Sequence, residues 1–303
     1  MKLATIKDGS RDGQLAVVSR DLKSAHMADA ICPTLQAALD DWAFIAPQLE
    51  ALTAQLNAGQ ARRAFDFDPA QCMAPLPRAF QLAIGAAYLD HVELEEPLIY
   101  QGGSGELLGP TDDIVLAHEE WGIDFEAGVA VIVDDLPMGA TPDEAHGRIR
   151  LLMLANDVSL RKLMPAELAN GFGFLQSKPA TGFSPLAVTP DELGESWRGG
   201  KLHLPLRSTW NGHLVGQPDA GVDMAFNFPQ LIAHLCKSRK LRAGSIVGSG
   251  AVSNKDATLG YSSIADAEPD TPFMRFGDTI RIEMLDAKGK SVFGAIEQTV
   301  RKA

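Results

Sequence analysis

The strongest constraint on the fold is a series of short apolar segments separated by turns. These segments are β-branched or alternate in polarity, and two of them contain hairpin turns at Asn211-Gly212 and Lys288-Gly289. Helical patterns do not alternate with them as they would in a parallel α/β sheet. The sequence therefore predicts an α+β chain, mostly β, with a mixed β-sandwich or β-roll as its main body. The predicted strand segments are residues 80–88, 127–133, 201–216, 244–252 and 278–300.

Two helical segments interrupt this pattern. A capping box that opens at Thr141 predicts a helix that runs to about Asn156. A second helix is predicted near residues 228–244, where Leu231 and Leu235 lie one turn apart and basic residues follow.

The first seventy or so residues have the pattern of a small separate domain. Apolar segments at 3–6 and 14–19 flank a turn at Asp12-Gly13 and predict a hairpin. Across residues 33–59 apolar side chains recur every three or four positions, which predicts a helix that Pro47 is expected to kink. A polar, proline-containing stretch follows, so we expect a small N-terminal α+β domain before the main domain. The predicted domains are residues 1–70 and 71–303.

Composition argues against several kinds of partner. The 303 residues carry a net charge of −12 and no block of lysine or arginine, so a nucleic-acid surface is not indicated. The sequence has no long apolar run and no leader-like start, so we expect a cytoplasmic protein with no membrane partner. Three cysteines without a C-x-x-C spacing signal neither a disulfide framework nor a zinc site.

One acid stands inside a segment that has the pattern of a fully buried strand. In GIDFEAGVAVIV, residues 122–133, Glu126 shares one face with Asp124 and Gly128. An ionised carboxylate in an apolar interior is costly unless a cation or hydrogen bonds compensate its charge. A solvated strand end or a pair with arginine explains Glu126 without a functional site, whereas a second acid nearby points to one.

Asp157 and Lys178 are the candidate partners of this acid. Asp157 lies in LANDVSLRK after the predicted helix, where an Asx turn is the alternative explanation. Two converging carboxylates repel unless one is protonated or a cation lies between them, and oxygen ligands suit Mg²⁺, Mn²⁺ or Ca²⁺. Lys178 follows a glycine-rich apolar run, which places its ammonium either close to this site or at the surface.

Taken in order, these segments resemble the fumarylacetoacetate hydrolase family, whose members cleave or decarboxylate 1,3-dicarbonyl acids. The resemblance runs from about Met73 to the C-terminus, and GFGFLQSKPA and YQGGSG are similar to one bacterial subgroup. It implies a fumarylacetoacetase-type β-sandwich and β-roll domain, a homodimer, and a divalent metal, with Mg²⁺ favoured and Mn²⁺ or Ca²⁺ as alternatives. The matching segments are APLPR, GAAYLDHVEL, GIDFEAGVAVIV, LANDVSLRKL, GFGFLQSKPATGFSP and AGSIVGSGAVSN.

The resemblance also implies roles for individual residues. Glu126 and Asp157 match acids that ligate the metal, and Lys178 matches a lysine that holds or polarises the water or carbonyl beside it. His91 falls at the histidine of a lid-borne His–Glu dyad that acts as a general base. An ordinary surface or helix-capping histidine is the alternative for His91. The predicted substrate-binding residues are Tyr88, Tyr100, Gln101, Arg161 and Gly250.

The chain departs from the family pattern at several positions. Gly128 stands where the second glutamate of a Glu-x-Glu motif is expected, so one metal ligand is missing. Asp124 replaces it only if the metal shifts by about 6–7 Å, two residues of β rise. We therefore expect a metal held by more water at lower affinity, or no metal. Leu94 stands at the dyad's glutamate, Ala251 at a hydroxyl residue, and Gln101 where many relatives have lysine. The segments after HVEL and YSSIAD are also short.

The function predicted from this resemblance is a metal-dependent hydrolase of aromatic catabolism. It would cleave a carbon–carbon bond of a 1,3-dicarbonyl acid such as fumarylacetoacetate or an acylpyruvate. The metal would stabilise the departing enolate while His91 activates water. A decarboxylase or isomerase of the same family would form the same enolate. Gly128 and Leu94 favour another alternative, a weak or inactive paralogue that binds a small dicarboxylic or keto acid.

Overall fold

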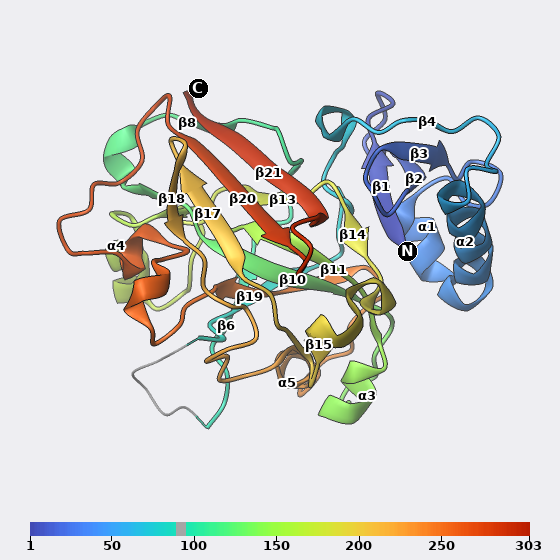
Figure 1. The fold of residues 1–303 in the computed structure, drawn as a ribbon. Helices are drawn as coiled ribbons and strands as arrows, with labels where there is room; N and C mark the ends of the chain where they lie inside the picture. The colour runs from blue at the N-terminus through green and yellow to red at the C-terminus, as the bar shows by residue number, and fades with distance from the viewer. Residues whose placement is uncertain (89–94) are drawn as a thin grey trace.

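The structure is a computed structural model that describes residues 1–88 and 95–303. A large mixed sheet and a smaller sheet make up the body, and short helices lie at its periphery (Figure 1). The predicted fold class, α+β and mostly β, is confirmed. None of the helices within these two ranges is long and apolar enough to cross a membrane.

The large sheet and its attached strands use twelve segments of the chain. They are β1 (Lys2–Ile6), β2 (Gln14–Val18), β3 (Ser24–Met27), β4 (Phe65–Asp66), β5 (Leu82–Gly85), β6 (Ile99–Gly102), β7 (Leu107–Leu108), β10 (Ala127–Val133), β11 (Ile149–Asn156), β13 (Thr181–Phe183), β14 (Ala187–Val188) and β19 (Ser245–Ala251). Their order is β4-β3-β2-β1-β14-β11-β10-β19-β5-β6, and β13 joins β11 to β7.

The smaller sheet runs in the order β18-β17-β20-β21-β8, and two short strand pairs and five α-helices complete the described fold. The five strands are β8 (Ile114–Leu116), β17 (Leu206–Trp210), β18 (His213–Gly216), β20 (Thr279–Leu285) and β21 (Ser291–Lys302). The pairs are β9 (Ile123–Asp124) with β12 (Ser159–Leu160), and β15 (Trp197–Arg198) with β16 (Lys201–Leu202). The helices are α1 (Leu35–Asp40), α2 (Trp42–Asn57), α3 (Pro142–His146), α4 (Met164–Asn170) and α5 (Phe228–Leu235).

Strand β10 lies at the centre of the core because both of its faces are covered. Val129 and Val131 point into the cluster that also holds Ile282 of the smaller sheet. Ile132 points into the opposite cluster, which includes Leu39 of the N-terminal helices. Full burial of each of these side chains contributes about 1.5–3 kcal/mol to the free energy of folding. The segment that carries Glu126 is therefore anchored on two sides.

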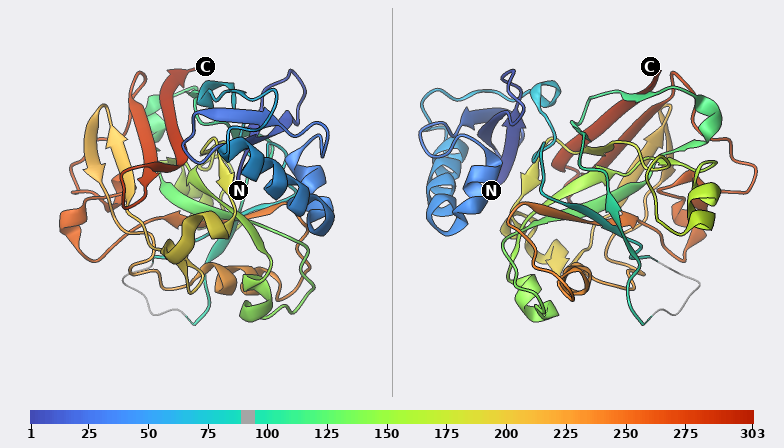
Figure 2. Two further views of the ribbon diagram at one scale, coloured as in Figure 1. Left: turned by 45° about the vertical axis from the view of Figure 1, so that its right-hand side comes forward. Right: turned by 180° about the vertical axis from the view of Figure 1, so that it is seen from behind.

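The N-terminal residues extend the large sheet instead of standing apart from it. The predicted hairpin is present, since β1 and β2 pair antiparallel from Lys2 with Val18 to Ile6 with Gln14. The predicted helix is divided into α1 and α2 at Asp41, and Pro47 lies inside α2. β1 also pairs with β14, which links this unit to the main body (Figure 2).

The predicted helix from Thr141 to Asn156 is wrong over most of its length. The capping box at Thr141 is present, but α3 ends at His146 and residues 149–156 form strand β11. Nearly every side chain of β11 is buried, and β10, β13 and β14 all pair with it. A continuous apolar run suits a buried strand as well as a buried helix, so periodicity could not separate the two. The second predicted helix ends earlier than expected, at Leu235.

Gly128 of β10 lies where two main chains approach each other very closely. It pairs with Ala155 of β11 and with Ala251 of β19. A Cβ at Gly128 would lie 2.5 Å from the carbonyl oxygen of Gly250 and 3.3 Å from the hydroxyl of Ser249. Main-chain atoms cannot rotate away as a side chain can, so any larger residue here must move the strand.

We expect Gly128→Ala to lower the free energy of unfolding by about 1–3 kcal/mol, the usual cost of overpacking a core. Gly103→Ala is the matched control, because a Cβ there meets no atom within 4 Å. Urea unfolding followed by circular dichroism would measure both variants. Equal midpoints for Gly128→Ala and the wild type would contradict the crowding seen at this position.

Candidate functional site

The register of β10 and β11 brings Glu126 and Asp157 together. Glu126 directly precedes β10 and Asp157 directly follows β11, and the strands are antiparallel with Ala127 opposite Asn156. The main-chain N–H of Asp157 donates to the carbonyl of Glu126 at 2.9 Å. The Asn156 side chain accepts from the N–H of Glu126 at 3.2 Å. Two acids thirty-one positions apart in the chain therefore lie at one corner of the sheet.

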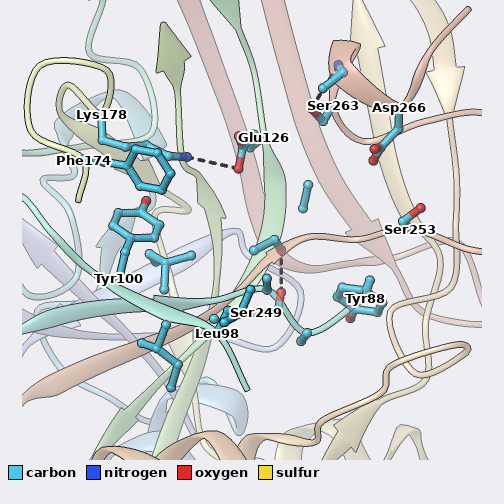
Figure 3. A pocket seen from close by; sticks show the side chains of 18 of the residues that line it. Tyr88, Leu98, Tyr100, Glu126, Phe174, Lys178, Ser249, Ser253, Ser263 and Asp266 are labelled. Atoms are coloured by element: carbon cyan, nitrogen blue, oxygen red, sulfur yellow. Dashed lines mark hydrogen bonds and ion pairs between the residues drawn. The ribbon is translucent and has the colours of Figure 1, made fainter. Parts of the chain in front are cut away.

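The ammonium of Lys178 lies between these two carboxylates. Its Nζ is 2.8 Å from Oδ2 of Asp157 and 3.1 Å from Oε2 of Glu126, and it also donates to the Asp157 carbonyl at 3.1 Å. Figure 3 shows the lysine side chain extended toward Glu126, with Tyr100 beside it. The Tyr100 hydroxyl donates to Oδ2 of Asp157, and Thr181 donates to Oδ1 at 3.0 Å.

Arg161 is the second cation of the cluster. Its Nη2 donates to Oε1 of Glu126 at 2.5 Å, and its Nε donates to Oδ2 of Asp124 at 2.8 Å. The Ser159 hydroxyl donates to the same Glu126 oxygen at 2.6 Å. The antiparallel pairing of β12 with β9 places Ser159 opposite Asp124, and the main-chain N–H of Arg161 donates to the Gly122 carbonyl. The sequence suggested an arginine partner for Glu126 as an alternative, and Arg161 is that partner.

Asp124 is fully buried, and hydrogen bonds compensate its charge. Its carboxylate accepts from the main-chain N–H of Ile264 at 2.6 Å, from that of Ala265 at 3.1 Å and from the Ser263 hydroxyl at 2.8 Å. With Arg161 these donors use both carboxylate oxygens. The structure therefore gives Asp124 no place as a substitute metal ligand.

The electrostatics keep both cations charged and the tyrosine neutral. Burial alone would lower the pKa of Lys178, but the carboxylates of Asp157 and Glu126 outweigh it and raise that pKa. Burial likewise opposes the raised pKa of Arg161, and the charges of Glu126 and Asp124 again prevail. Burial and the neighbouring Asp157 raise the pKa of Tyr100, so its hydroxyl stays protonated.

This cluster lines a cavity of about 790 Å³. Glu126, Arg161, Lys178 and Asp266 contribute its charged lining, and Tyr100 packs edge-on against Phe174 with ring centroids 5.5 Å apart. The remaining lining is mostly apolar, so a small ligand with one charged end and one apolar end matches it. The apolar lining includes Ile84, Leu98, Ile99, Met164, Leu168 and Phe174.

The other predicted site residues have different outcomes. Tyr88 and Gly250 line the cavity, and the Tyr88 hydroxyl donates to the Ala220 carbonyl at 2.6 Å. Gln101 follows Tyr100 on β6, is exposed and is not among the residues that line the cavity. His91, the predicted general base, lies outside the described residues.

Comparison with known families agrees with this arrangement. Residues 1–78 match the family described as fumarylacetoacetase N-terminal domain 2. Residues 81–301 match the family described as fumarylacetoacetate (FAA) hydrolase C-terminal. The chain belongs to the fumarylacetoacetate hydrolase family. This result confirms the resemblance carried by the sequence motifs.

Relatives of the chain include hydrolases and tautomerases. It is 29% identical over 178 residues to 2,4-didehydro-3-deoxy-L-rhamnonate hydrolase of Sphingomonas sp. (strain SKA58), a match that covers 56% of this chain and 59% of that relative. It is 27% identical over 222 residues to oxaloacetate tautomerase YisK of Bacillus subtilis, covering 69% and 68%.

Solved structures of this family share the fold over the whole chain. Fumarylacetoacetate hydrolase of Exiguobacterium antarcticum has a TM-score of 0.75 at 17% identity and covers 100% of both chains. Maleylpyruvate hydrolase of Sphingobium sp. SYK-6, solved with manganese(II) and pyruvate, has a TM-score of 0.71 at 17% identity with the same coverage. At this identity the likeness establishes the fold alone.

The residues present do not fit a resident divalent cation in this arrangement. Within residues 1–88 and 95–303, no group of three or more histidine, cysteine, aspartate or glutamate side chains converges as metal ligands do. Glu126 and Asp157 are the two acids at the corner, and each of their four carboxylate oxygens already accepts a hydrogen bond or ion pair. Divalent magnesium prefers six oxygen ligands in a regular octahedron. The predicted roles of Glu126 and Asp157 as metal ligands therefore stay predictions.

A positioning residue that the sequence did not reveal is Glu167 of α4. Its carboxylate accepts from the main-chain N–H groups of Leu175, Gln176 and Ser177, at 3.2, 2.7 and 3.2 Å. The Ser177 hydroxyl donates to it as well. These bonds fix the loop that ends at Lys178. Helix α4 is short and has no strong apolar period, so no local pattern predicts it.

We expect Glu167→Gln to weaken the anchoring of residues 175–177. Amide exchange there should accelerate roughly fivefold to tenfold, the equivalent of about one net hydrogen bond. Hydrogen exchange read by mass spectrometry would measure this, with the exposed Glu106→Gln as control. Unchanged protection in Glu167→Gln would contradict the role.

The anchoring by Glu167 should also depend on pH. The Ser177 hydroxyl and the loop N–H groups hold the pKa of Glu167 below its ordinary value. The stabilisation is therefore complete above the ordinary pKa and is lost as the pH falls through the lowered one. Protection factors of wild type and Glu167→Gln should converge in acid; a constant ratio down to the lowest pH would argue against this carboxylate.

Proposed function

We propose that this protein acts on a small 2-oxo acid with a second carbonyl group, bound in the cavity beside Arg161 and converted through an enolate. The observation that carries the proposal is the convergence of Glu126, Lys178 and Arg161 on the wall of a cavity that is otherwise mostly apolar, with Asp157 behind Lys178. Two of the relatives are named for oxo acids of this kind. They are oxaloacetate tautomerase YisK and 2,4-didehydro-3-deoxy-L-rhamnonate hydrolase.

Arg161 supports the recognition of a substrate carboxylate. Its Nε and Nη2 hold Asp124 and Glu126, whereas the contact of Nη1 within the described residues is the sulfur of Met164 at 3.7 Å. The side chain lines the cavity and is 25% exposed. Nη1 therefore has N–H groups to offer a carboxylate, and a guanidinium held rigidly by two acids binds it with little loss of entropy.

The N–H groups that Arg161 presents to the cavity would favour an enolate. When a 2-oxo acid loses a proton beside its carbonyl group, negative charge develops on the carbonyl oxygen. Fixed cations near that oxygen stabilise the charge more in the transition state than in the substrate. Arg161 is held charged and in place by Asp124 and Glu126, so its Nη1 group needs no reorganisation to donate to the developing charge.

Asp266 is the residue we assign to proton transfer. It lines the same cavity as Arg161, and its charge helps to raise the pKa of that arginine. Asp266 is exposed to solvent as well as to the cavity, so its carboxylate can exchange a proton with water, whereas Glu126 is buried between two cations. The reaction class that these groups support is keto–enol tautomerisation or isomerisation.

Carbon–carbon bond hydrolysis, the finer prediction from the sequence, is the second candidate. Its support is the match of His91 to the family's general base and the hydrolase named among the relatives. A hydrolase needs an activated water in addition to the enolate. The predicted homodimer, the cytoplasmic location and the role in aromatic catabolism stay predictions as well.

We expect Arg161→Met to weaken the binding of oxalate, a stable mimic of the pyruvate enolate. Loss of hydrogen bonds to a charged group costs about 1.5–3 kcal/mol, which is roughly tenfold to more than hundredfold in affinity. Isothermal titration in EDTA would measure this. Arg150→Met is the matched control, because Arg150 is 24% exposed and also pairs with an aspartate, Asp134. Equal affinity of Arg161→Met and wild type would refute the carboxylate site, and Arg161→Lys tests it if the methionine variant unfolds.

Turnover separates the two candidate reactions. Asp266→Asn should lower the rate of oxaloacetate enol–keto conversion about a hundredfold, the lower end for a general acid–base residue, without weakening oxalate binding. The exposed Asp270→Asn serves as control. Ultraviolet absorbance follows this reaction and, in parallel, loss of an acylpyruvate. Loss of acylpyruvate without tautomerisation would favour the hydrolase instead.

A further inference from the structure

We propose that the ammonium of Lys178 permanently occupies the place where a divalent cation would have to sit between Glu126 and Asp157. The protein then holds no resident metal, and the lysine is its built-in cation. This inference deepens the proposed function by naming the positive charge at the site. Its test is a measurement of metal binding, so it can fail while oxo-acid binding stands.

The hydrogen-bond geometry of the ammonium carries the first step. A lysine ammonium has three N–H donors and no acceptor. The structure gives Nζ of Lys178 three acceptors, which are Oδ2 and the carbonyl of Asp157 and Oε2 of Glu126, at 2.8, 3.1 and 3.1 Å. The ammonium also lies 5.2 Å from the ring centroid of Tyr100, a favourable cation–π distance. Every donor of Lys178 is thus used inside the cluster.

Burial makes this arrangement exclusive. The Lys178 side chain is 6% exposed, and those of Glu126 and Asp157 are 10% and 5% exposed. A metal between these acids would have to displace the ammonium or lie beside it. Two cations a few ångströms apart in a poorly solvated site repel strongly, and a displaced ammonium would lose all its partners. In this arrangement the carboxylate oxygens that would face a metal are therefore taken by the ammonium.

The chain also prevents the lysine from leaving. Lys178 is followed by Pro179, which restricts the backbone at residue 178. The three residues before it, 175–177, donate their main-chain N–H groups to Glu167. The backbone on both sides of Lys178 is thus held, and its side chain is directed to the acids.

Position 128 has no room for a side chain that could serve as a third metal ligand. An acid at this position would lie on the same strand face as Glu126, two residues away. The carbonyl oxygen of Gly250 fills the space 2.5 Å from where the Cβ of residue 128 would be, and the main chain of β19 supplies that atom. The close approach of β10 and β19 thus requires glycine at position 128 and leaves no space for an acidic side chain there.

Manganese binding to the EDTA-treated wild type and to Lys178→Met tests this inference. The wild type should leave Mn²⁺ free in solution at millimolar concentration, as read by electron paramagnetic resonance, and its melting temperature should not respond to Mn²⁺. Lys178→Met leaves two buried acids without their cation, so it should bind Mn²⁺ at least about tenfold more tightly and melt higher when Mn²⁺ is added.

Two control variants make the result specific. Lys201→Met removes an ammonium that donates to the Met224 carbonyl outside the cluster, and it should behave as wild type. Adding Asp157→Asn to Lys178→Met should abolish the gained Mn²⁺ binding. One tightly bound Mn²⁺ per wild-type chain, lost in Asp157→Asn, would overturn the inference, and this arm decides it even if Lys178→Met does not fold.

Oxalate titration separates this inference from the proposed function. Oxalate binding to wild type in EDTA supports both. If oxalate fails to bind with and without Mn²⁺ while Mn²⁺ stays free, the proposed function fails and the built-in cation stands. If oxalate binds only when one Mn²⁺ is bound, the built-in cation is refuted and the oxo-acid site is kept.

Discussion

The ion pairs that Lys178 makes with Asp157 and Glu126 are the interaction on which the rest of the site depends. Removing one partner of a buried ion pair leaves an uncompensated charge and costs about 3–5 kcal/mol. The segments that carry these residues are therefore tied to one another. β10 and β11 supply the acids through their register, and the loop held by Glu167 supplies the lysine.

The close contact of β10 and β19 links the packing of the sheet to the chemistry of the site. Gly128 and the carbonyl of Gly250 leave no volume for a third acid beside Glu126. In a family that includes hydrolases and tautomerases, this chain shares the common fold. Its cavity keeps an arginine edge and an apolar wall, which are features for binding a small carboxylic acid.

Much of the fold and part of the site could be predicted from the sequence. Local patterns predicted the N-terminal hairpin and the central strand at 127–133. The family motifs predicted that Glu126 lies near a second acid, Asp157. The helix predicted to Asn156 was wrong because a buried apolar run has no period that separates a helix from a central strand. The anchor at Glu167 was missed because it acts through main-chain N–H groups, which leave no residue pattern in the loop that they fix.

By itself, the sequence determined the family, the mostly β composition and the identity of the charged residues, because these depend on residue types and their order along the chain. Only the tertiary structure decided which cation compensates the buried acids. Arg161 and Lys178 lie 35 and 52 positions after Glu126 in the sequence. Both contact it because strand register and loop anchoring set distances that spacing along the chain does not encode. Charge compensation depends on those distances, and so it is a property of the folded chain.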